Sequence, residues 1–123
     1  MQVLVVDDSQ IMRKIIMGAL KKLGVNDIVE ASNGQEAVEM LVKPSDIGLV
    51  LMDWNMPTMT GIEAVKKLRS DRVTVPVVMV TTEAEKEKVM EAIKSGANDY
   101  LIKPFNPKDI QGKLEKFLPA QKG

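Results

Sequence analysis

Residues 3–8 read VLVVDD, so four apolar residues suited to a β-strand lead directly into two carboxylates. Residues 49–53 repeat the pattern as LVLMD, which ends at Asp53. A carboxylate at the end of a buried strand usually needs a metal ion, a cationic partner or a chemical role. Two further apolar runs also end in polar residues, VVMVTT at 77–82 and YLIK at 100–103. The four runs predict a site built from strand ends.

Short β-branched runs alternate with longer segments of helical period along the whole chain, which is typical of a parallel sheet covered by helices. Right-handed crossovers then favour an α/β fold with a doubly wound five-stranded parallel sheet of strand order 2-1-3-4-5, flavodoxin-like and (βα)5 in outline. We expect a single domain over residues 1–123, a length that suits one core. The predicted strands are 2–7, 27–31, 47–53, 77–81 and 99–102, and the predicted helices are 10–23, 34–43, 61–70, 83–95 and 107–118.

Local signals mark several helix ends. Gly24 follows the first helix and suits a left-handed C-terminal cap. Two pairs predict capping boxes at helix starts, Thr60 with Glu63 and Thr82 with Glu85. Gly112 should weaken the last helix by about 1 kcal/mol relative to alanine unless a neighbour packs against it. The apolar residues of the first helix share one stripe: Ile11, Ile15, Ile16, Ala19, Leu20 and Leu23.

The composition excludes several classes of function. Lys plus Arg and Asp plus Glu both number 17, so no excess of positive charge predicts a nucleic-acid or membrane partner. The chain has no cysteine and no histidine, which rules out disulfides, thiolate chemistry and imidazole ligands. A bound metal ion would therefore have oxygen ligands. Without a leader-like N-terminus or an apolar run near the roughly 20 residues that cross a bilayer, we expect a soluble cytoplasmic protein.

The predicted topology brings the acidic residues together. Ligands of such sheets bind at the carboxyl ends of the strands where the strand order reverses, here between the first and third strands. Asp7, Asp8 and Asp53 fall at that point. Unit charges about 4 Å apart repel by roughly 4 kcal/mol at an effective dielectric constant of 20, so a cation is needed among them. With oxygen donors alone, Mg²⁺ is the predicted ion.

Four segments, taken in order and spacing, resemble the receiver domain of response regulators. They are VVDDS at 5–9, DWNMP at 53–57, VTTE at 80–83 and YLIKPF at 100–105. The resemblance runs from Val3 to Phe117 and is greatest to stand-alone chemotaxis regulators of the CheY type. It implies a two-component signalling protein that a histidine kinase phosphorylates on Asp53.

The resemblance also assigns roles within the site. Asp8, Asp53 and the backbone carbonyl of Asn55 would coordinate Mg²⁺ directly, with Asp7 acting through water. Lys103 would neutralise charge on the phosphoryl group, and its bond to Pro104 is expected to be cis. Such a protein is not an enzyme in the usual sense, because it catalyses only its own phosphorylation and dephosphorylation.

A conformational switch is implied as well. The hydroxyl of Thr81 would move toward the phosphoryl group, and Tyr100 would turn inward in response. Asn55 and Glu83 would tune dephosphorylation by controlling the approach of water. The face expected to change lies on the fourth helix, fifth strand and fifth helix, and would bind the flagellar motor switch protein through Lys86, Val89, Ala97, Tyr100 and Lys113.

Other functions remain open at this point. A monomeric chemotaxis regulator, served in some cases by a dedicated phosphatase, competes with a phosphorelay intermediate and with a receiver fragment of a larger regulator. A Mg²⁺-dependent phosphohydrolase would use Asp53 as its nucleophile, but such enzymes usually have a second carboxylate two residues later, where this chain has Asn55. A flavin-binding domain of the same topology is disfavoured, because the acidic strand ends would repel a flavin phosphate.

Overall fold

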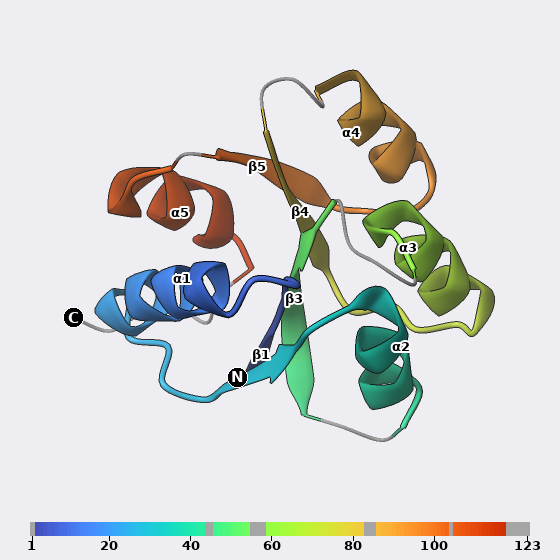
Figure 1. The fold of residues 1–123 in the computed structure, drawn as a ribbon, viewed down its shortest axis with the longest axis horizontal. Helices are drawn as coiled ribbons and strands as arrows, with labels where there is room; N and C mark the ends of the chain where they lie inside the picture. The colour runs from blue at the N-terminus through green and yellow to red at the C-terminus, as the bar shows by residue number, and fades with distance from the viewer. Residues whose placement is uncertain (1, 44–45, 55–58, 83–85, 104, 118–123) are drawn as a thin grey trace.

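A parallel sheet with helices on both faces organises the chain (Figure 1). The computed structural model describes residues 2–43, 46–54, 59–82, 86–103 and 105–117. The strands are β1 Gln2–Val6, β2 Ile28–Ala31, β3 Ile47–Asp53, β4 Val77–Thr82 and β5 Asp99–Lys103. The helices are α1 Gln10–Lys22, α2 Gly34–Val42, α3 Gly61–Ser70, α4 Lys86–Lys94 and α5 Pro107–Leu114.

The strand order is β2-β1-β3-β4-β5 and each neighbouring pair is parallel, which confirms the predicted fold class and topology. Each strand end lies within one residue of its predicted position. The strands could be predicted from their apolar runs because both faces of a parallel sheet are buried, so such strands are almost continuously apolar.

Two apolar clusters pack on opposite faces of the sheet. One cluster joins alternate strand residues such as Met52 and Met79 to helices α2, α3 and α4. The other joins Leu51 and Val80 to helices α1 and α5. Figure 1 shows this division, with α1 and α5 on one side of the sheet and the other three helices across it. Successive residues of a strand face opposite sides, so the side on which each strand-end residue lies follows from its position.

Helix α1 ends as predicted, but only part of the apolar stripe predicted for it is buried. Gly24 has φ of 88°, and the N–H groups of Gly24 and Val25 donate to Lys21 and Leu20, which is the Schellman arrangement. Ile16 and Leu20 are buried. Ile11 and Ile15, on the same predicted stripe, are 74% and 53% exposed because no described element covers that side of the helix.

Helix α5 is shorter than predicted. The expected range was 107–118, but the helix ends at Leu114 and residues 115–117 form a turn. The N–H of Phe117 donates to the carbonyl of Leu114, three residues back, so the chain tightens and the α-helical pattern stops. Helix α4 is described from Lys86 to Lys94, and the first three residues of the predicted range 83–95 lie outside the described residues.

One predicted capping box is confirmed. Thr60 accepts a hydrogen bond from the N–H of Glu63, whose carboxylate accepts one from the N–H of Thr60. The box predicted at Thr82 and Glu85 is not described, because Glu85 lies outside the described residues, while Thr82 is the last residue of β4. Helix α5 has a capping box that we did not predict, formed by Asn106 and Asp109. In the part of the chain that the structure describes, no helix is long and apolar enough to span a membrane.

Candidate functional site

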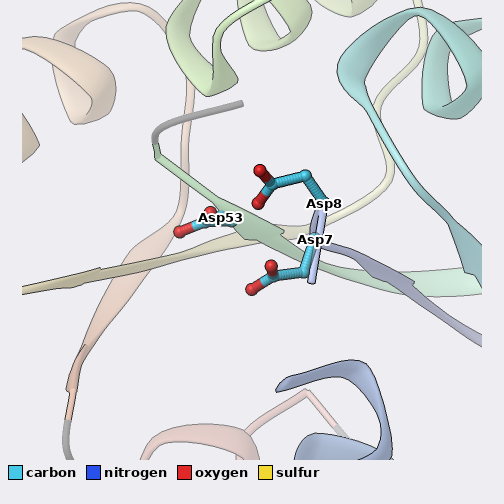
Figure 2. A group of neighbouring side chains, drawn as sticks. All are labelled: Asp7, Asp8 and Asp53. Atoms are coloured by element: carbon cyan, nitrogen blue, oxygen red, sulfur yellow. The ribbon is translucent and has the colours of Figure 1, made fainter. Parts of the chain in front are cut away.

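Three carboxylates meet at the carboxyl ends of β1 and β3. Asp7 and Asp8 follow the last residue of β1, and Asp53 is the last residue of β3. One oxygen atom from each of the three side chains lies within 4.8 Å of the other two. Figure 2 shows the three carboxyl groups pointing toward the same side. Asp7 and Asp53 are buried, whereas Asp8 is exposed, so the cluster opens to solvent through Asp8.

The lysine of β5 completes this cluster. The ammonium nitrogen of Lys103 lies 3.0 Å from Oδ1 of Asp53 and 3.7 Å from Oδ2 of Asp7. Side chains alternate between the two faces of a sheet, and the residues two positions earlier in each strand, Val5, Leu51 and Leu101, belong to the cluster under α1 and α5. The three charged side chains therefore lie on that same face, which explains why they converge. With an exposed side-chain fraction of only 19%, Lys103 makes these ion pairs in a largely dry environment.

Hydrogen bonds to three other residues hold Asp7 in place. Its N–H donates to the carbonyl of Ala31, and its Oδ1 accepts from the N–H of Ser9 at 2.8 Å. The guanidinium of Arg13 donates to the carbonyl oxygen of Asp7 at 2.6 Å and to the carboxylate of Glu30 at 2.9 Å. Arg13 therefore joins α1 to the ends of β1 and β2 and fixes the segment that carries the acidic pair.

Tight backbone packing fixes Asp53 from the other side. The N–H of Trp54 donates to the carbonyl of Val80, and the N–H of Gly61 donates to the carbonyl of Trp54. A Cβ atom at Gly61 would lie 2.5 Å from the Cε of Met79 and 2.7 Å from the carbonyl oxygen of Asp53. Only glycine fits here, so the start of α3 can lie directly against the strand end that carries Asp53.

The electrostatics of the cluster favour a bound cation. Burial raises the pKa of Asp7 and of Asp53 above the ordinary range, although hydrogen bonds from Ser9 and Lys103 oppose the change. The neighbouring carboxylates raise both pKa values further. Among the described residues, Oδ2 of Asp7 is a buried side-chain oxygen without a hydrogen-bond partner. Clustered carboxylates that repel one another, one of them with a buried oxygen lacking a hydrogen bond, provide the oxygen donors that Mg²⁺ prefers.

Thr81 and Tyr100 lie on the opposite face of the sheet from Asp53. Thr81 is buried in β4 and pairs with Ile102 of β5, while Tyr100 pairs with Met79. By strand alternation these residues face the cluster of α2, α3 and α4, against which the half-buried Tyr100 packs. Thr81 therefore lies one strand from Tyr100 and one position beyond Val80, the β4 partner of Asp53.

The remaining predicted site residues differ in where they lie. Lys113 of α5 places its ammonium 4.3 Å from the centre of the Tyr100 ring. Ala97 is 7% exposed and belongs to the core, so its side chain offers little surface to a partner. The predicted residues outside the described part are Asn55, Glu83 and Pro104, together with the side chains of Lys86 and Val89.

Two residues at or near these positions were missed by sequence reasoning. Arg13 occupies the second turn of α1, and its helical spacing gave no indication that it reaches back to Asp7. Asp99 directly precedes Tyr100 and accepts from Lys113 and Lys116. The signal available was an acidic residue that opens a predicted strand, but its partners lie 14 or more positions away in the sequence.

The fold and the site define a class: a doubly wound α/β domain with carboxylates and a lysine at its topological switch point. The family model described as "Response regulator receiver domain" matches residues 3–115. The chain belongs to the response regulator receiver domain family.

Individual relatives agree with this assignment. A "Chemotaxis protein CheY homolog" of Campylobacter jejuni is 46% identical over an alignment of 125 positions, which covers 100% of this chain and 96% of that protein. The solved structure of "Chemotaxis response regulator CheY4 of Vibrio cholerae" is 37% identical, with a TM-score of 0.83 and coverage of 95% and 98%. The receiver domain of sensor histidine kinase PA1611 from Pseudomonas aeruginosa is 27% identical, with a TM-score of 0.82 and coverage of 94% and 95%. That receiver domain has a magnesium ion coordinated in its active site cleft.

Proposed function

We propose that the chain is a single receiver domain over residues 1–123 that accepts a phosphoryl group on Asp53 from a histidine kinase. The observation that carries the proposal is the buried Asp53 carboxylate with the Lys103 ammonium at 3.0 Å and two more carboxylates beside it. A carboxylate oxygen of Asp53 forms the new P–O bond as the P–N bond of the donor phosphohistidine breaks. The departing imidazole takes up a proton, and Lys103 stabilises the charge on the phosphoryl oxygens.

The same carboxylates would hold Mg²⁺, through Asp8, Asp53 and the carbonyl of Asn55, with Asp7 acting through water. Bound there, Mg²⁺ supplies positive charge that offsets both the clustered carboxylates and the phosphoryl oxygens. The orphaned oxygen of Asp7 supports this assignment. The magnesium ion of the Pseudomonas aeruginosa receiver domain supports it independently.

Phosphorylation would act on a partner face made by α4, β5 and α5. The phosphoryl group adds charge of about −1.5 to −2 and attracts the hydroxyl of Thr81, whose movement makes room for Tyr100 to turn inward. A change from 1:99 to 99:1 in a two-state equilibrium takes about 5.5 kcal/mol of differential stabilisation. Several hydrogen bonds to charged groups, at roughly 1.5–3 kcal/mol each, would together supply that stabilisation.

We infer that the biological role is that of a monomeric, cytoplasmic chemotaxis regulator whose partner is the flagellar motor switch protein. The names of the relatives from Campylobacter jejuni and Vibrio cholerae support this role. Within the face, Tyr100 and Lys113 would contact the partner together with Lys86 and Val89, while Ala97 supports the face from beneath. A phosphorelay intermediate or a receiver cut from a larger regulator is the second candidate, and the same site would serve it.

The chain would catalyse only its own phosphorylation and dephosphorylation. The dephosphorylation would be tuned by Asn55 and Glu83, and a dedicated phosphatase would be a further partner. A Mg²⁺-dependent phosphohydrolase is the less favoured candidate. Sustained turnover of phosphate monoesters, many per protein molecule, would support that enzyme and contradict the receiver.

Trp54, the only tryptophan, adjoins Asp53 and provides the test. Its fluorescence should change on addition of Mg²⁺ and again on addition of acetyl phosphate, a small phosphoryl donor. The second change should be lost in Asp53→Asn. No response to either reagent would contradict the proposal. Binding of a motor switch peptide only after phosphorylation would then favour chemotaxis over a phosphorelay.

A further inference from the structure

A second charged cluster lies at the beginning of β5, at the opposite end of the strand from Lys103. The Asp99 carboxylate accepts hydrogen bonds from the ammonium of Lys113 through Oδ1 at 3.2 Å and pairs with Lys116 through Oδ2 at 2.7 Å. Its Oδ1 also accepts from the N–H of Tyr100 at 2.8 Å. Only 14% of the Asp99 side chain is exposed, so the carboxylate is held on three sides.

Lys113 has two partners at once. Its ammonium pairs with Asp99 and also lies 4.3 Å from the centre of the Tyr100 ring, within the distance at which a cation and an aromatic face attract. Lys113 comes from α5, whereas Tyr100 faces the cluster of α2, α3 and α4, so the lysine reaches past edge strand β5. The Asp99 carboxylate thus holds the Lys113 ammonium in place, and that ammonium lies over the Tyr100 ring.

The surroundings leave Tyr100 room to change position. A groove of about 690 Å³ lies between β5 and α5, lined by residues that include Tyr100, Gly112 and Lys113. Apart from the adjoining residues and backbone of α5 itself, no described atom lies within 4 Å of the position that a Cβ at Gly112 would take, so the groove has open space there. In such a setting, the position of a half-buried ring depends on the few contacts that hold its outer side.

The Asp99 contact persists at neutral pH. Burial alone would raise the pKa of Asp99, but hydrogen bonds from Lys116, from the N–H of Tyr100 and from Lys113 outweigh it and lower the pKa. The charged groups that face this carboxylate are Lys113 of α5 and Lys116 of the turn after it. The lowered pKa keeps the Asp99 carboxylate ionised near neutral pH, so it can hold both lysines there.

We infer that Asp99 is a positioning residue: by holding Lys113 over the ring, it keeps Tyr100 in the position seen here. The inference rests on the proposed function in that it adds to the control of Tyr100, the residue proposed to switch. Asp99 touches neither the phosphoacceptor nor its carboxylate neighbours. It sets the starting position from which phosphorylation must displace the ring.

Tyr100 is the only tyrosine, so protein made with 3-fluorotyrosine gives a single assigned ¹⁹F resonance. The change in that resonance between H₂O and D₂O reports how much water reaches the ring. The variants are Asp99→Asn and Lys113→Gln, each of which breaks the contact, and Lys113→Arg, which keeps a cation over the ring. Lys116→Gln is the matched control, because it removes an equal charge from Asp99 without touching Tyr100.

The expected result is a larger solvent effect in Asp99→Asn and Lys113→Gln, moving toward the value of free fluorotyrosine, with Lys113→Arg and Lys116→Gln close to the parent protein. An unchanged ring in Asp99→Asn would overturn the inference, as would an equal effect in Lys116→Gln. The proposed function is tested separately on the parent protein with Mg²⁺ and beryllofluoride, a tetrahedral substitute for a phosphoryl group. A resonance that does not respond there contradicts the switch, while the variants alone still decide the role of Asp99.

Discussion

The ammonium nitrogen of Lys103 lies 3.0 Å from Oδ1 of Asp53 although the two residues are 50 positions apart and on strands that are not neighbours in the sheet. One lysine thus partly neutralises a cluster of three carboxylates. This relationship makes the site's charge balance testable by substitution.

Lys103→Met should reduce both stability and phosphorylation. Loss of the cation leaves Asp53 without its charged partner, and an unpaired buried group of this kind costs about 1–3 kcal/mol of the free energy of unfolding. Loss of a group that stabilises developing charge typically slows a reaction about 10²–10³-fold. Urea unfolding in EDTA and the rate of Trp54 fluorescence change with acetyl phosphate measure the two effects. The control is Lys67→Met, which removes an exposed lysine paired with Asp71 and should cost at most about 0.5 kcal/mol.

Asp7→Asn should stabilise the metal-free protein in a pH-dependent way. The pKa of Asp7 is raised in the folded state, so ionisation of Asp7 lowers stability as pH rises from the unfolded value of 3.8 through the folded value. The variant avoids that loss, and its advantage in EDTA should be greatest at neutral pH and shrink as pH falls toward 3.8. Urea unfolding of both proteins from pH 4 to pH 7 measures it, and an advantage that grows on acidification contradicts the argument. Saturating Mg²⁺ at neutral pH should stabilise the parent protein more than the variant.

Two glycines should respond oppositely to alanine. A Cβ atom at Gly112 would have no described neighbour within 4 Å, so Gly112→Ala should raise stability by about 1 kcal/mol through helix propensity. At Gly61 the added carbon would meet Met79 and the backbone of Asp53, so Gly61→Ala should lower stability by about 1–3 kcal/mol. It should also slow phosphorylation, because the strand end that carries Asp53 must shift. Equal unfolding midpoints for the two variants would be inconsistent with this account.

Glu83→Lys should lengthen the lifetime of the phosphorylated protein. The resemblance places Glu83 beside the approach of water to the acyl phosphate, where a long cationic side chain would hinder that approach. The measurement is the decay of ³²P-labelled protein after removal of the donor. Glu87→Lys, an identical charge change on an exposed position of α4, is the control and should leave the decay unchanged. Equal decay in parent and Glu83→Lys proteins would remove Glu83 from the mechanism.

The sequence was sufficient for the sheet and for the acidic cluster for one physical reason. A parallel sheet buries both faces of each strand, so its strands read as apolar runs, and a polar residue at the end of a run is conspicuous. Asp7 and Asp53 were therefore predictable as neighbours as soon as the strand order was inferred. Lys103 also follows an apolar run, but its role at the site was expected from the resemblance to receiver domains.

The contacts that position the site residues were harder to predict from the sequence. Arg13 and Asp99 act through partners on other elements, and nothing in their local spacing distinguishes them from ordinary surface charges. The exposed Ile11 and Ile15 show the same limit for helices, because periodicity marks an apolar stripe but not how much of it a neighbouring element covers. The end of α5 at Leu114 depends on a local turn that apolar spacing does not report.

The distribution of the site over β1, β3 and β5 links it to the cooperativity of folding. A chain in which the edge strand β5 has detached retains Asp7 and Asp53 but loses Lys103, so partially folded forms have no complete site. A ligand held by all three residues therefore stabilises only the fully assembled sheet, by an amount set by its concentration relative to its dissociation constant. Hydrogen exchange should then slow most at amides that open only in global unfolding, so occupancy of the site becomes a measure of how completely the domain has folded.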